Sequence, residues 1–386
     1  MRLCIVGGPL QGMEASFLAH EAGYETVVID RRRDAPALSV CDEPHVLDPL
    51  KESDEASRIL ESCDVVIPAC EELDLLEHLD RTLSGTSVPF LFDIDAYGVS
   101  SSKNRSNGIM ESVGVPLPGH WPECGFPVVI KPSSQSGSVG VSVAFDRAGV
   151  DRGLEIVRSI GDEPVIQEFV HGKSVSIEVI GDGDTARSYV TTEVVLDSDY
   201  DCKMVRCSPD VLPERDDTEF RDIGRRVAEA IGLKALMDVE AIMTPRGLRV
   251  LEIDARIPSQ TPAAILTATG VNLLEELVTG SIGSPAGRRP DGGSGIYWHL
   301  HFRDGVLRTT GEKEFSKVRS PTMAAGLFGS DRSISDYVPG ASEWHGTFMV
   351  SGRTPEEAES RRLRVLDSIS DACGVREYID GAPEVV

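Results

Sequence analysis

The residues best suited to chemistry lie in two neighbouring stretches that carry acidic side chains at every second position. Asp238 and Glu240 stand in "MDVEAI", and Glu252, Asp254 and Arg256 stand in "LEIDAR". Successive side chains of a β-strand point to opposite faces, so each set would lie on one face of its strand. Facing carboxylates repel one another unless cations lie between them. The pattern therefore favours a site for an oxygen-liganded cation such as Mg²⁺, Ca²⁺ or Mn²⁺.

The turn between these two strands sets their register. Residues 245–247 read Pro-Arg-Gly, and a three-residue hairpin loop with glycine in the left-handed position would pair Thr244 with Leu248. Counting back from that pair predicts two acidic pairs across the hairpin, Asp238 with Asp254 and Glu240 with Glu252. The other face is then wholly apolar, with Met237, Val239, Ala241, Met243, Leu251, Ile253 and Ala255. A solvent-facing acidic surface is the alternative, which the apolar back face disfavours.

Two lysines with small polar neighbours indicate a site for anions. Lys103 is expected in the first turn of a helix from Ser101 to Val113, where a cation opposes the helix dipole unless an anionic partner compensates it. Lys131 ends the apolar strand "FPVVIKP", and the stretch "SSQSGSVG" after it is expected to be a hairpin loop. Loops of small residues present backbone N–H groups, as phosphate-binding loops do. A solvated lysine and a plain surface hairpin are the alternatives.

The N-terminal part of the chain alternates strands with helices, which predicts a parallel sheet covered by helices. The expected strands are "RLCIVGG", "YETVVID", "DVVIPAC" and "PFLFD", and the expected helices are 11–22 and 72–83. Ligands of such folds bind beyond the carboxyl ends of the strands, so the turns "GGPLQG" and "CEE" are candidate ligand contacts. Pro9 stands where a dinucleotide fingerprint needs its middle glycine, which argues against a nicotinamide cofactor.

Composition limits the classes of protein to which the chain can belong. Its 386 residues exceed one ordinary domain, and 40% hydrophobic and 26% charged residues are typical of globular proteins. A formal net charge of −25 argues against a nucleic-acid partner. No apolar run approaches the roughly 20 residues of a spanning helix, so we expect no membrane partner and a cytoplasmic location. The eight cysteines form no CxxC pair and are expected to be free thiols.

Three domains are expected along the chain. Residues 1–96 would form the N-terminal sheet domain, residues 97–282 alternate strands and helices in an α+β style, and residues 283–386 would form a small C-terminal domain. The boundary near residue 283 lies in "GSPAGRRPDGG", whose composition is typical of a linker. The sequence is compatible with a homo-oligomer.

Several motifs resemble those of the ATP-grasp family and occur in the family's order. They are Lys103, "VIKPSSQSGSVGV", "VIQEFVHG", "DYDCKM" and "VLEIDARIP". The resemblance implies an ATP-grasp fold, α/β and α+β, with an N-terminal Rossmann-like parallel-sheet domain and a small C-terminal domain. It also implies a carboxylate–amine or carboxylate–thiol ligase that uses ATP and Mg²⁺ and binds the nucleotide between two α+β subdomains.

The resemblance assigns expected roles to the matching residues. Those expected to bind ATP are Lys103, Lys131, Ser136, Gly137, Ser138, Glu168, Phe169, Val170 and Glu178. In this set the two lysines contact phosphates, Glu168–Val170 hold the adenine, and Glu178 replaces the glutamate that many members use for the ribose. The expected magnesium ligands are Glu240, Glu252 and Asp254, the last in place of the family's frequent asparagine. Lys203 is expected to steady the transferred phosphate.

A fuller set of motifs is similar to a family of ligases of pyrrolysine biosynthesis. These motifs are "VGGPLQGMEA", "IPACEE", "DYDCKM", "MDVEAI" and "VLEIDARIPSQTP". In that family the N-terminal turn and the acid after the "IPA" strand hold L-lysine. The residues expected on the substrate side are Leu10, Gln11, Glu71, Glu72, Asp238 and Ser259, with Asp238 facing an ornithine ammonium group. Pro9 stands where relatives are expected to carry a lysine.

The activity implied by this resemblance is an ATP-dependent, ADP-forming amide ligase. It would join the carboxylate of 3-methyl-D-ornithine to the ε-amine of L-lysine through an acyl phosphate, and Arg256 would stabilise the oxyanion of the tetrahedral intermediate. One alternative is a dipeptide or D-amino-acid ligase that uses another pair of amino acids. Another is a non-catalytic nucleotide-binding subunit, which the complete set of carboxylates disfavours.

Overall fold

The computed structural model describes residues 1–137, 139–282 and 292–383. The chain forms two compact units, each assembled from separate segments. The first unit contains Met1–Ile94, Val194–Val211 and Arg256–Val386, and the second contains Asp95–Glu193 and Leu212–Ala255. Both units mix helices and strands, in agreement with the predicted fold class. The division into three domains stays a prediction.

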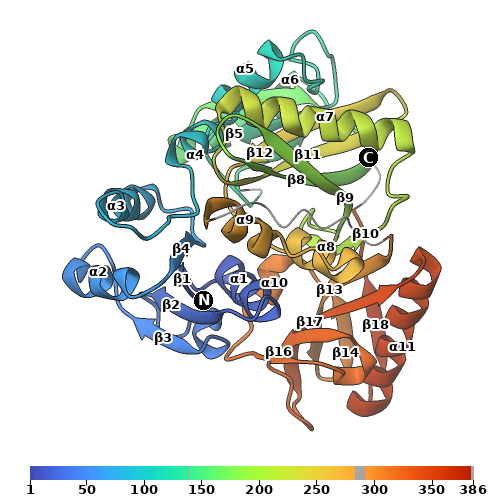
Figure 1. Ribbon diagram of the computed structural model, residues 1–386. Coiled ribbons are helices and arrows are strands. Elements are labelled where there is room, and N and C mark those ends of the chain that lie inside the picture. Colours follow the sequence, from blue (N-terminus) through green and yellow to red (C-terminus); the bar gives the residue numbers. More distant parts are fainter. Residues whose placement is uncertain (138, 283–291, 384–386) are drawn as a thin grey trace. The chain divides into compact units, whose positions relative to one another are not determined.

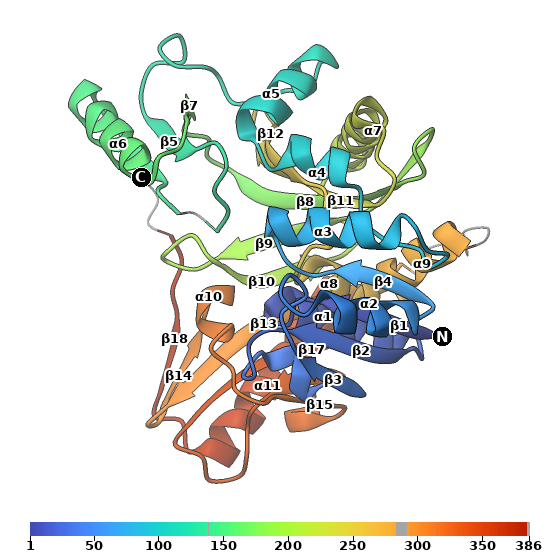
Figure 2. The ribbon, with the colours of Figure 1, turned by 90° about the vertical axis from the view of Figure 1, so that its left-hand side faces the viewer.

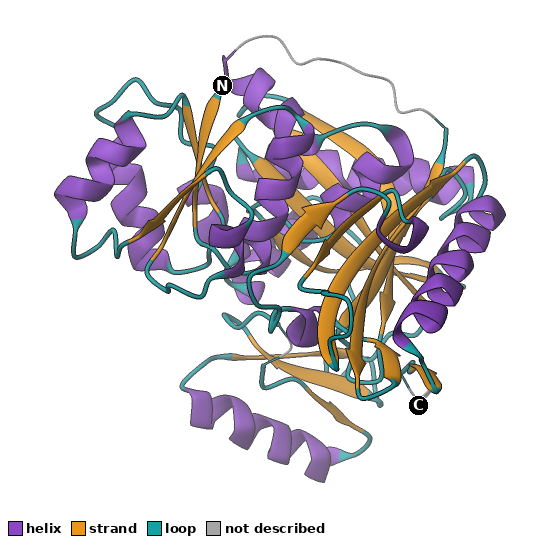
Figure 3. Cartoon of the chain, turned by 90° about the horizontal axis from the view of Figure 1, so that it is seen from below, coloured by secondary structure: helices purple, strands orange, loops and turns teal. Residues whose placement is uncertain are grey.

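A parallel four-stranded sheet opens the first unit. Its strands, in sheet order, are β3 (Glu43–Val46), β2 (Glu25–Asp30), β1 (Arg2–Val6) and β4 (Val65–Pro68). The helices are α1 (Leu10–Glu21), the 3-10 helix η1 (Pro36–Ser39), α2 (Ser53–Glu61) and α3 (Leu73–Leu83). Figure 3 shows this alternation in the segment that begins at the label N. The predicted strand "PFLFD" is reduced to a parallel bridge between Phe90 and Val66 of β4.

A mainly antiparallel sheet forms the other part of the first unit. Its strands, in sheet order, are β10 (Cys202–Cys207), β13 (Ser294–Arg303), β17 (Glu343–Gly352), β16 (Arg332–Ser335) and β15 (Thr322–Ala324). Beside β13 lie β14 (Val306–Thr309) and then β18 (Glu377–Asp380). The helices of this part are α8 (Thr261–Thr269), α9 (Leu273–Ile282), α10 (Glu312–Phe315), η2 (Leu327–Gly329) and α11 (Pro355–Cys373).

The two faces of this sheet carry different helices because side chains alternate along its strands. Trp298 of β13 and Phe348 of β17 point to one face, where they share an apolar cluster with α11. His299, next to Trp298, points to the other face and stacks on Phe315 of α10, with ring centroids 4.4 Å apart. The short helix α10 is thereby fixed against the β13–β17 pair.

A small three-stranded sheet begins the second unit. Its order is β6 (Ser142–Ala144), β5 (Val128–Pro132) and β7 (Pro164–Glu168), all antiparallel. Figure 2 shows α6 (Arg147–Ile160) lying beside β5 and β7. Their shared core contains Val128, Ile130, Ala144, Val150 and Val157. The pairing of β5 with β6 confirms the predicted hairpin, which the small-residue loop closes.

A larger antiparallel group of strands completes the second unit. Its order is β12 (Gly247–Asp254), β11 (Leu236–Thr244), β8 (Lys173–Gly181) and β9 (Ala186–Leu196). Figure 1 shows α7 (Glu214–Ile231) lying across β8 and β11. The buried residues of α7 recur three or four positions apart, as a helix with one apolar face requires: Phe220, Ile223, Gly224, Val227 and Ala228. The remaining helices are α4 (Ile94–Ser100) and α5 (Lys103–Ser112).

The acidic pairs predicted across the β11–β12 hairpin are confirmed. Asp238 lies opposite Asp254, and Glu240 lies opposite Glu252. The back face of the hairpin is apolar and fully buried at Met237, Val239, Ala241, Ile253 and Ala255. Burial of this face leaves one orientation for the strands, since a shift of one residue would bury the carboxylates.

The turn of the hairpin differs from the predicted three-residue loop. Thr244 pairs with Gly247, so the turn has two residues, and Gly247 adopts a φ of 100° that glycine tolerates best. The extra residue is instead Leu251, which forms a β-bulge after Val250. Because the total count is unchanged, the acidic pairs keep their predicted register. Leu248 and Val250 are buried in the apolar face, while Leu251, predicted there, is only partly buried.

The described residues include no helix with both the length and the apolar character needed to cross a membrane. All eight cysteines are free thiols, as predicted, and three of them are buried. Cys4 and Cys63, for example, belong to the apolar core of the parallel sheet. These thiols therefore contribute to packing.

Helix α1 packs closely against the turn that follows β1, and Gly12 lies at the contact. A Cβ atom at this position would lie 1.9 Å from the carbonyl oxygen of Gly7, so the helix would have to move. We expect Gly12→Ala to destabilise the protein by about 1–3 kcal/mol. Gly108→Ala in α5 is the matched control, because its Cβ would meet nothing within 4 Å and alanine favours the helix by up to about 1 kcal/mol. Thermal unfolding followed by circular dichroism measures both, and an unchanged melting temperature for Gly12→Ala would contradict the prediction.

Candidate functional site

Five carboxylates share one face of the larger sheet in the second unit. Glu178 of β8 lies opposite Asp238 of β11, so Glu178, Asp238 and Asp254 form a row across three strands. The three predicted magnesium ligands, Glu240, Glu252 and Asp254, are partly buried on this face. Glu178 has no exposed surface, so the predicted contact with a ribose would require its side chain to become accessible. The sequence analysis did not predict that Glu178 lies beside Asp238, although Glu178 continues the alternation of polar residues along β8.

Lys103 balances part of this negative charge. Its Nζ lies 2.9 Å from Oε2 of Glu252 and donates to the carbonyl oxygen of Gln135, also at 2.9 Å. Burial alone would lower the pKa of Lys103, but Glu252, Asp254 and Glu240 outweigh burial and raise the pKa. Lys103 is therefore a fixed positive charge at the edge of the carboxylate face. An anionic partner, suggested by the position of Lys103 at the start of α5, is present as Glu252.

Lys131 reaches the same hairpin from the end of β5. Its Nζ donates to the carbonyl oxygen of Leu251 at 3.2 Å, so the bulge residue supplies the acceptor. Burial lowers the pKa of Lys131, Glu252 opposes this effect, and the nearby Lys103 adds to the lowering. The two lysines predicted to contact ATP phosphates are thus brought together beside the predicted magnesium ligands.

The small-residue loop 133–140 starts at the N-terminus of α5. Ser133 accepts hydrogen bonds from two backbone N–H groups in the first turn of that helix, at 2.8 and 3.1 Å. Farther along, Ser136 and Gly137 are exposed, and Gly137 has a φ of 60°. Ser138, also predicted to contact ATP, lies outside the described residues. The loop therefore has one anchored end and one exposed section next to Lys103.

The residues predicted to hold adenine lie at the end of β7. The carboxylate of Glu168 accepts from the backbone N–H of Gly119 at 3.2 Å and from Arg246 at 2.7 Å. Burial would raise the pKa of Glu168, but these two donors outweigh it and lower the pKa. Phe169 and Val170 follow and are partly buried. With the Glu168 side chain engaged, the backbone of this segment is the part suited to adenine.

Three residues predicted for catalysis and substrate binding meet in the first unit. Arg256 Nε lies 2.9 Å from Oε1 of Glu71. With its amide oxygen toward Arg256, Gln11 accepts from the guanidinium at 3.0 Å. Leu10 precedes Gln11 at the start of α1 and is buried. Arg256 and Glu71, for which the sequence predicted separate roles, therefore form one ion pair.

Glu72, also predicted on the substrate side, pairs with a different arginine from Glu71. Its two carboxylate oxygens accept from Arg31 at 2.8 and 2.7 Å, in a bidentate ion pair. Both residues line a hollow of about 180 Å³ at the carboxyl ends of β1 and β2. Such an edge is the usual ligand position of a parallel α/β sheet, as the sequence analysis expected.

Lys203, predicted to steady a transferred phosphate, contacts the C-terminal end of the first unit. Its Nζ donates to Oδ1 of Asp380 and to the carbonyl oxygen of Gly381, both at 2.5 Å. The side chain is buried, with Lys203 only 4% exposed. A phosphate at Lys203 would therefore have to share the ammonium group with Asp380 or replace it.

A buried carboxylate that the sequence analysis missed is Glu14 of α1. It accepts hydrogen bonds from the backbone N–H of Gln260 at 2.5 Å and from the hydroxyl of Tyr297. Gln260 has a φ of 70°, in the left-handed region that non-glycine residues seldom adopt. Burial raises the pKa of Glu14 well above its ordinary value; the Gln260 N–H opposes this shift and Glu312 adds to it. The strained backbone at Gln260 is thus held by a buried acid.

Glu312 of α10 holds the same segment through side chains. Its Oε2 accepts from the hydroxyl of Ser259 at 3.2 Å and from the amide of Gln260 at 3.0 Å. Burial raises the pKa of Glu312 and Asp201 adds to the increase, while Ser259 lowers it. Ser259 was predicted on the substrate side, and the structure places it beside an acid that no local pattern in the sequence indicated.

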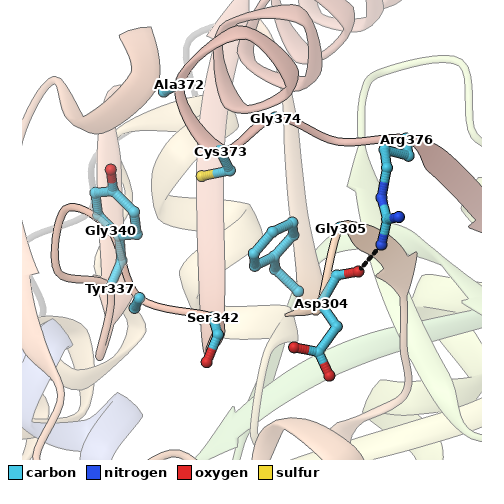
Figure 4. A pocket seen from close by; sticks show the side chains of 11 residues that line it. Asp304, Gly305, Tyr337, Gly340, Ser342, Ala372, Cys373, Gly374 and Arg376 are labelled. Atoms are coloured by element: carbon cyan, nitrogen blue, oxygen red, sulfur yellow. Dashed lines mark hydrogen bonds between the residues drawn. The ribbon is translucent and has the colours of Figure 1, made fainter.

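A separate hollow of about 340 Å³ lies in the C-terminal part of the first unit. Figure 4 shows Tyr337 and Cys373 at this hollow, and Arg376 donating to the carbonyl oxygen of Asp304 at 2.5 Å. None of the residues predicted for the site lines it. The hollow is therefore distinct from the groups described above.

Known proteins resemble this chain in sequence along nearly its whole length. Residues 100–260 match the ATP-grasp domain family. The chain is 34% identical over 375 residues to the 3-methyl-D-ornithine–L-lysine ligase of Methanosarcina barkeri, covering 96% of this chain and 98% of that protein. It is 33% identical to the ligase of the same name from Methanosarcina acetivorans, with the same coverage. The chain belongs to the family of 3-methyl-D-ornithine–L-lysine ligases.

Membership of this ligase family fixes the class of the enzyme. It is an ATP-grasp, ADP-forming carboxylate–amine ligase, which confirms the predicted resemblance and enzyme class. The carboxylate hairpin, Lys103 and Lys131 all fall within the residues that match the ATP-grasp domain. Glu14 and Glu312 lie outside those residues, in the first unit.

Solved structures confirm the predicted fold. The biotin carboxylase domain of Hydrogenobacter thermophilus 2-oxoglutarate carboxylase, solved with MgADP and bicarbonate, matches with a TM-score of 0.73 at 16% identity and covers 95% of this chain and 89% of that one. The L-amino acid ligase of Bacillus licheniformis matches with a TM-score of 0.66 at 16% identity, covering 95% and 97%. At these identities the likeness shows the fold alone.

Burial of Glu14 predicts a specific dependence of stability on pH. Because its pKa in the folded protein is raised well above the ordinary 4.5, folding favours the protonated acid. The stability that this group contributes is present below pH 4.5 and is lost as the pH rises through the raised pKa. Glu14→Gln removes the titration and keeps an oxygen for the Gln260 N–H. We expect the unfolding free energy of the wild type, relative to Glu14→Gln, to fall as the pH rises toward neutral.

Urea denaturation at a series of pH values measures this difference. Glu61→Gln is the control for the loss of one carboxylate, since Glu61 ends α2 with an exposed side chain. A relative stability of the wild type that is constant, or that increases with pH, would contradict the assignment of a raised pKa to Glu14.

Proposed function

We propose that this ligase joins the carboxylate of 3-methyl-D-ornithine to the ε-amine of L-lysine through an acyl phosphate, as a step of pyrrolysine biosynthesis. The observation that carries the proposal is the carboxylate hairpin with its two lysines. It occurs in a chain that matches ligases of that name over 96% of its length. The chain also has acidic residues, Glu71 and Asp238, at the positions where amine-bearing substrates are expected.

The donors of the hairpin fit a magnesium ion. Glu240, Glu252 and Asp254 offer only carboxylate oxygens, which hard cations prefer. The ammonium group of Lys103 beside Glu252 supports the choice, since it indicates that this face stabilises positive charge. We propose that the three acids hold Mg²⁺, which when bound would neutralise charge on the phosphates of ATP.

The nucleotide is proposed to lie between the two lysines and the segment Glu168–Val170 at the end of β7. Lys103 and Lys131 would contact its phosphates, and backbone N–H groups of the loop 133–140 would contribute further donors. The backbone of Glu168–Val170 would bind adenine, because the Glu168 carboxylate is engaged by Gly119 and Arg246. Lys131 is partly buried, so a contact between its ammonium group and a phosphate would be screened less than in open water.

The reaction is proposed to proceed in two steps. A carboxylate oxygen of the ornithine attacks the γ-phosphorus of ATP, the bond to the β–γ bridging oxygen breaks, and ADP leaves. The ε-amine of lysine then attacks the acyl carbon, loses a proton, and expels inorganic phosphate. Arg256 is proposed to stabilise the oxyanion of this second step, and Lys203 the transferred phosphate.

The ion pair of Arg256 and Glu71 supports the proposal that these two residues act on the substrates at one site. Glu71 is proposed to bind an ammonium group of L-lysine, together with Leu10, Gln11 and Glu72. An acid only 2.9 Å from the guanidinium would keep the arriving amine close to the proposed oxyanion donor. Holding both reacting groups in one place is one way in which an enzyme lowers its barrier.

Asp238 provides a specific prediction for recognition of the ornithine. If its carboxylate faces the ornithine ammonium group, Asp238→Asn removes one charge-assisted hydrogen bond of about 1.5–3 kcal/mol. We expect kcat/KM for the ornithine substrate to fall by about tenfold to a hundredfold, with KM for ATP unchanged. Steady-state release of ADP measures both parameters. Asp184→Asn, at an exposed position after β8, is the matched control. Wild-type kinetics for Asp238→Asn would contradict the assignment.

Mass spectrometry of the product tests the proposed function itself. The protein is incubated with ATP, Mg²⁺, L-lysine and one of 3-methyl-D-ornithine, D-ornithine or D-alanine. The expected product has the summed mass of the ornithine and lysine minus one water, with one ADP released per amide. Nε-acetyl-lysine should not be a substrate, because it lacks a free ε-amine.

The same experiment separates the alternatives. Faster ADP release with another pair of amino acids would identify a dipeptide or D-amino-acid ligase instead. Release of no ADP with any pair, together with intact ATP binding, would identify a nucleotide-binding protein without ligase activity.

A further inference from the structure

Two histidines in the antiparallel sheet of the first unit stand side by side. His301 of β13 pairs directly with His345 of β17, and their rings stack with centroids 4.3 Å apart and planes 4° apart. The two residues are only 8% and 7% exposed. Oε1 of Glu314 on α10 lies 3.5 Å from Nδ1 of His301 and 3.5 Å from Nε2 of His345. One carboxylate oxygen thus faces one nitrogen of each ring.

These separations suit ligands of a metal ion better than hydrogen-bond partners. Charge-assisted N–H···O bonds bring the heavy atoms to about 2.7–2.9 Å. Around tetrahedral zinc, with metal–ligand distances near 2.0–2.1 Å, neighbouring ligand atoms lie about 3.3 Å apart. The three candidate ligand atoms here all lie within 4.8 Å of one another. Bringing them around one ion would take a contraction of the cluster together with a turn of one of the stacked rings.

Carboxylates also lie behind the two rings. Nε2 of His301 is 3.2 Å from Oε1 of Glu343, and Nδ1 of His345 is 3.9 Å from Oδ2 of Asp336. Metal-binding histidines usually have such a carboxylate on their second nitrogen, which fixes the tautomer and orients the ring. Lys317 donates to the other oxygen of Glu314, Oε2, so that Oε1 is the oxygen turned toward the rings.

For His301 and Glu314, the surroundings favour the protonation state of a metal ligand. Burial lowers the pKa of His301 and His345 adds to the lowering, so the His301 ring is neutral and keeps a lone pair. Burial would raise the pKa of Glu314, but Lys317 and His345 outweigh it and lower the pKa. Glu314 is therefore a carboxylate at neutral pH.

We propose that His301, His345 and Glu314 bind one divalent transition-metal ion, for which Zn²⁺ is the best chemical match. Two imidazoles and one carboxylate suit zinc, whereas Mg²⁺ prefers oxygen ligands alone. Because the rings are stacked, one ring has to turn about its Cβ–Cγ bond so that both lone pairs meet at the ion. Three protein ligands leave the fourth tetrahedral position to water.

The ion would connect this site to the segment held by Glu312. Glu314 and Glu312 are two residues apart on α10, so their side chains leave the helix on different sides. Glu312 contacts Ser259 and Gln260. A metal ion on Glu314 would fix α10 against β13 and β17, and through α10 it would steady Glu312. This role does not depend on which amino acids the ligase joins.

Cobalt is a suitable probe for the proposed site in the full-length protein. The protein is stripped with EDTA and titrated with Co²⁺ in excess Mg²⁺, which keeps the carboxylate hairpin from taking up the probe. We expect one Co²⁺ per chain with the intense visible absorption of a tetrahedral site containing nitrogen ligands, displaced by Zn²⁺. We also expect Zn²⁺ to raise the melting temperature of the stripped protein.

Four variants locate the site. His345→Gln and Glu314→Gln should abolish the tetrahedral spectrum and the rise in melting temperature caused by Zn²⁺. Glu343→Gln, which removes the carboxylate behind His301, should weaken binding by about tenfold to a hundredfold. His120→Gln is the matched control, because His120 is an exposed histidine that contacts the single carboxylate of Glu111. It should bind Co²⁺ as the wild type does.

Two outcomes would overturn the proposal. One is a wild-type protein that binds no tetrahedral Co²⁺, and the other is binding that survives both His345→Gln and Glu314→Gln. The readout is the change caused by the metal, so a lower melting temperature of a variant in EDTA does not obscure it. Glu314 is only partly buried, so Glu314→Gln keeps the test decisive if a buried histidine variant unfolds. Ligase activity is not needed for any of these measurements.

Discussion

Electrostatic repulsion between facing carboxylates is the constraint on which the second unit depends. Two like charges about 5 Å apart repel by about 3 kcal/mol at an effective dielectric near 20. Four such groups face one another across β11 and β12, and Glu178 extends the row. The fold offsets this cost in two ways: the apolar back face fixes the hairpin, and Lys103 and Lys131 approach from separate elements. The protein holds a concentration of negative charge that only cations can balance, which is the property that a site for a metal and a nucleotide requires.

The hairpin also shows which features of a site follow from sequence and which do not. The alternation of acidic and apolar residues, with a countable turn, was enough to predict both acidic pairs. Counting residues from the turn could not reveal that the extra residue is Leu251 and does not lie in the turn. Both arrangements give the same two acidic pairs. The difference matters, since the bulge supplies the carbonyl oxygen to which Lys131 donates. Local periodicity therefore fixes register, while the position of an irregularity depends on contacts made by distant segments.

The parts of the site that the sequence analysis missed are contacts between residues far apart in the chain. Glu14 and Gln260 are separated by 246 positions, and Lys203 and Asp380 by 177. Neither Glu14 nor Asp380 stands in a pattern that differs from that of an ordinary helix or strand, so its type and spacing carry no signal. The strands and helices that were predicted follow from apolar periodicity, which is local. The pairing of Glu14 and Glu312 with the "PSQTP" segment became visible only when the fold brought them together.

Retention of a strained backbone at Gln260 follows from the two acids that hold it. A non-glycine residue with a φ of 70° costs about 1–3 kcal/mol and persists only where its surroundings determine it fully. Glu14 binds the backbone N–H of Gln260, and Glu312 binds its side-chain amide, so the residue is held at two points. Both acids have pKa values raised mainly by burial, and each accepts hydrogen bonds from two partners. The segment between β12 and α8 is thus fixed by the fold itself, so a substrate proposed to bind there would not spend interaction energy on ordering the chain.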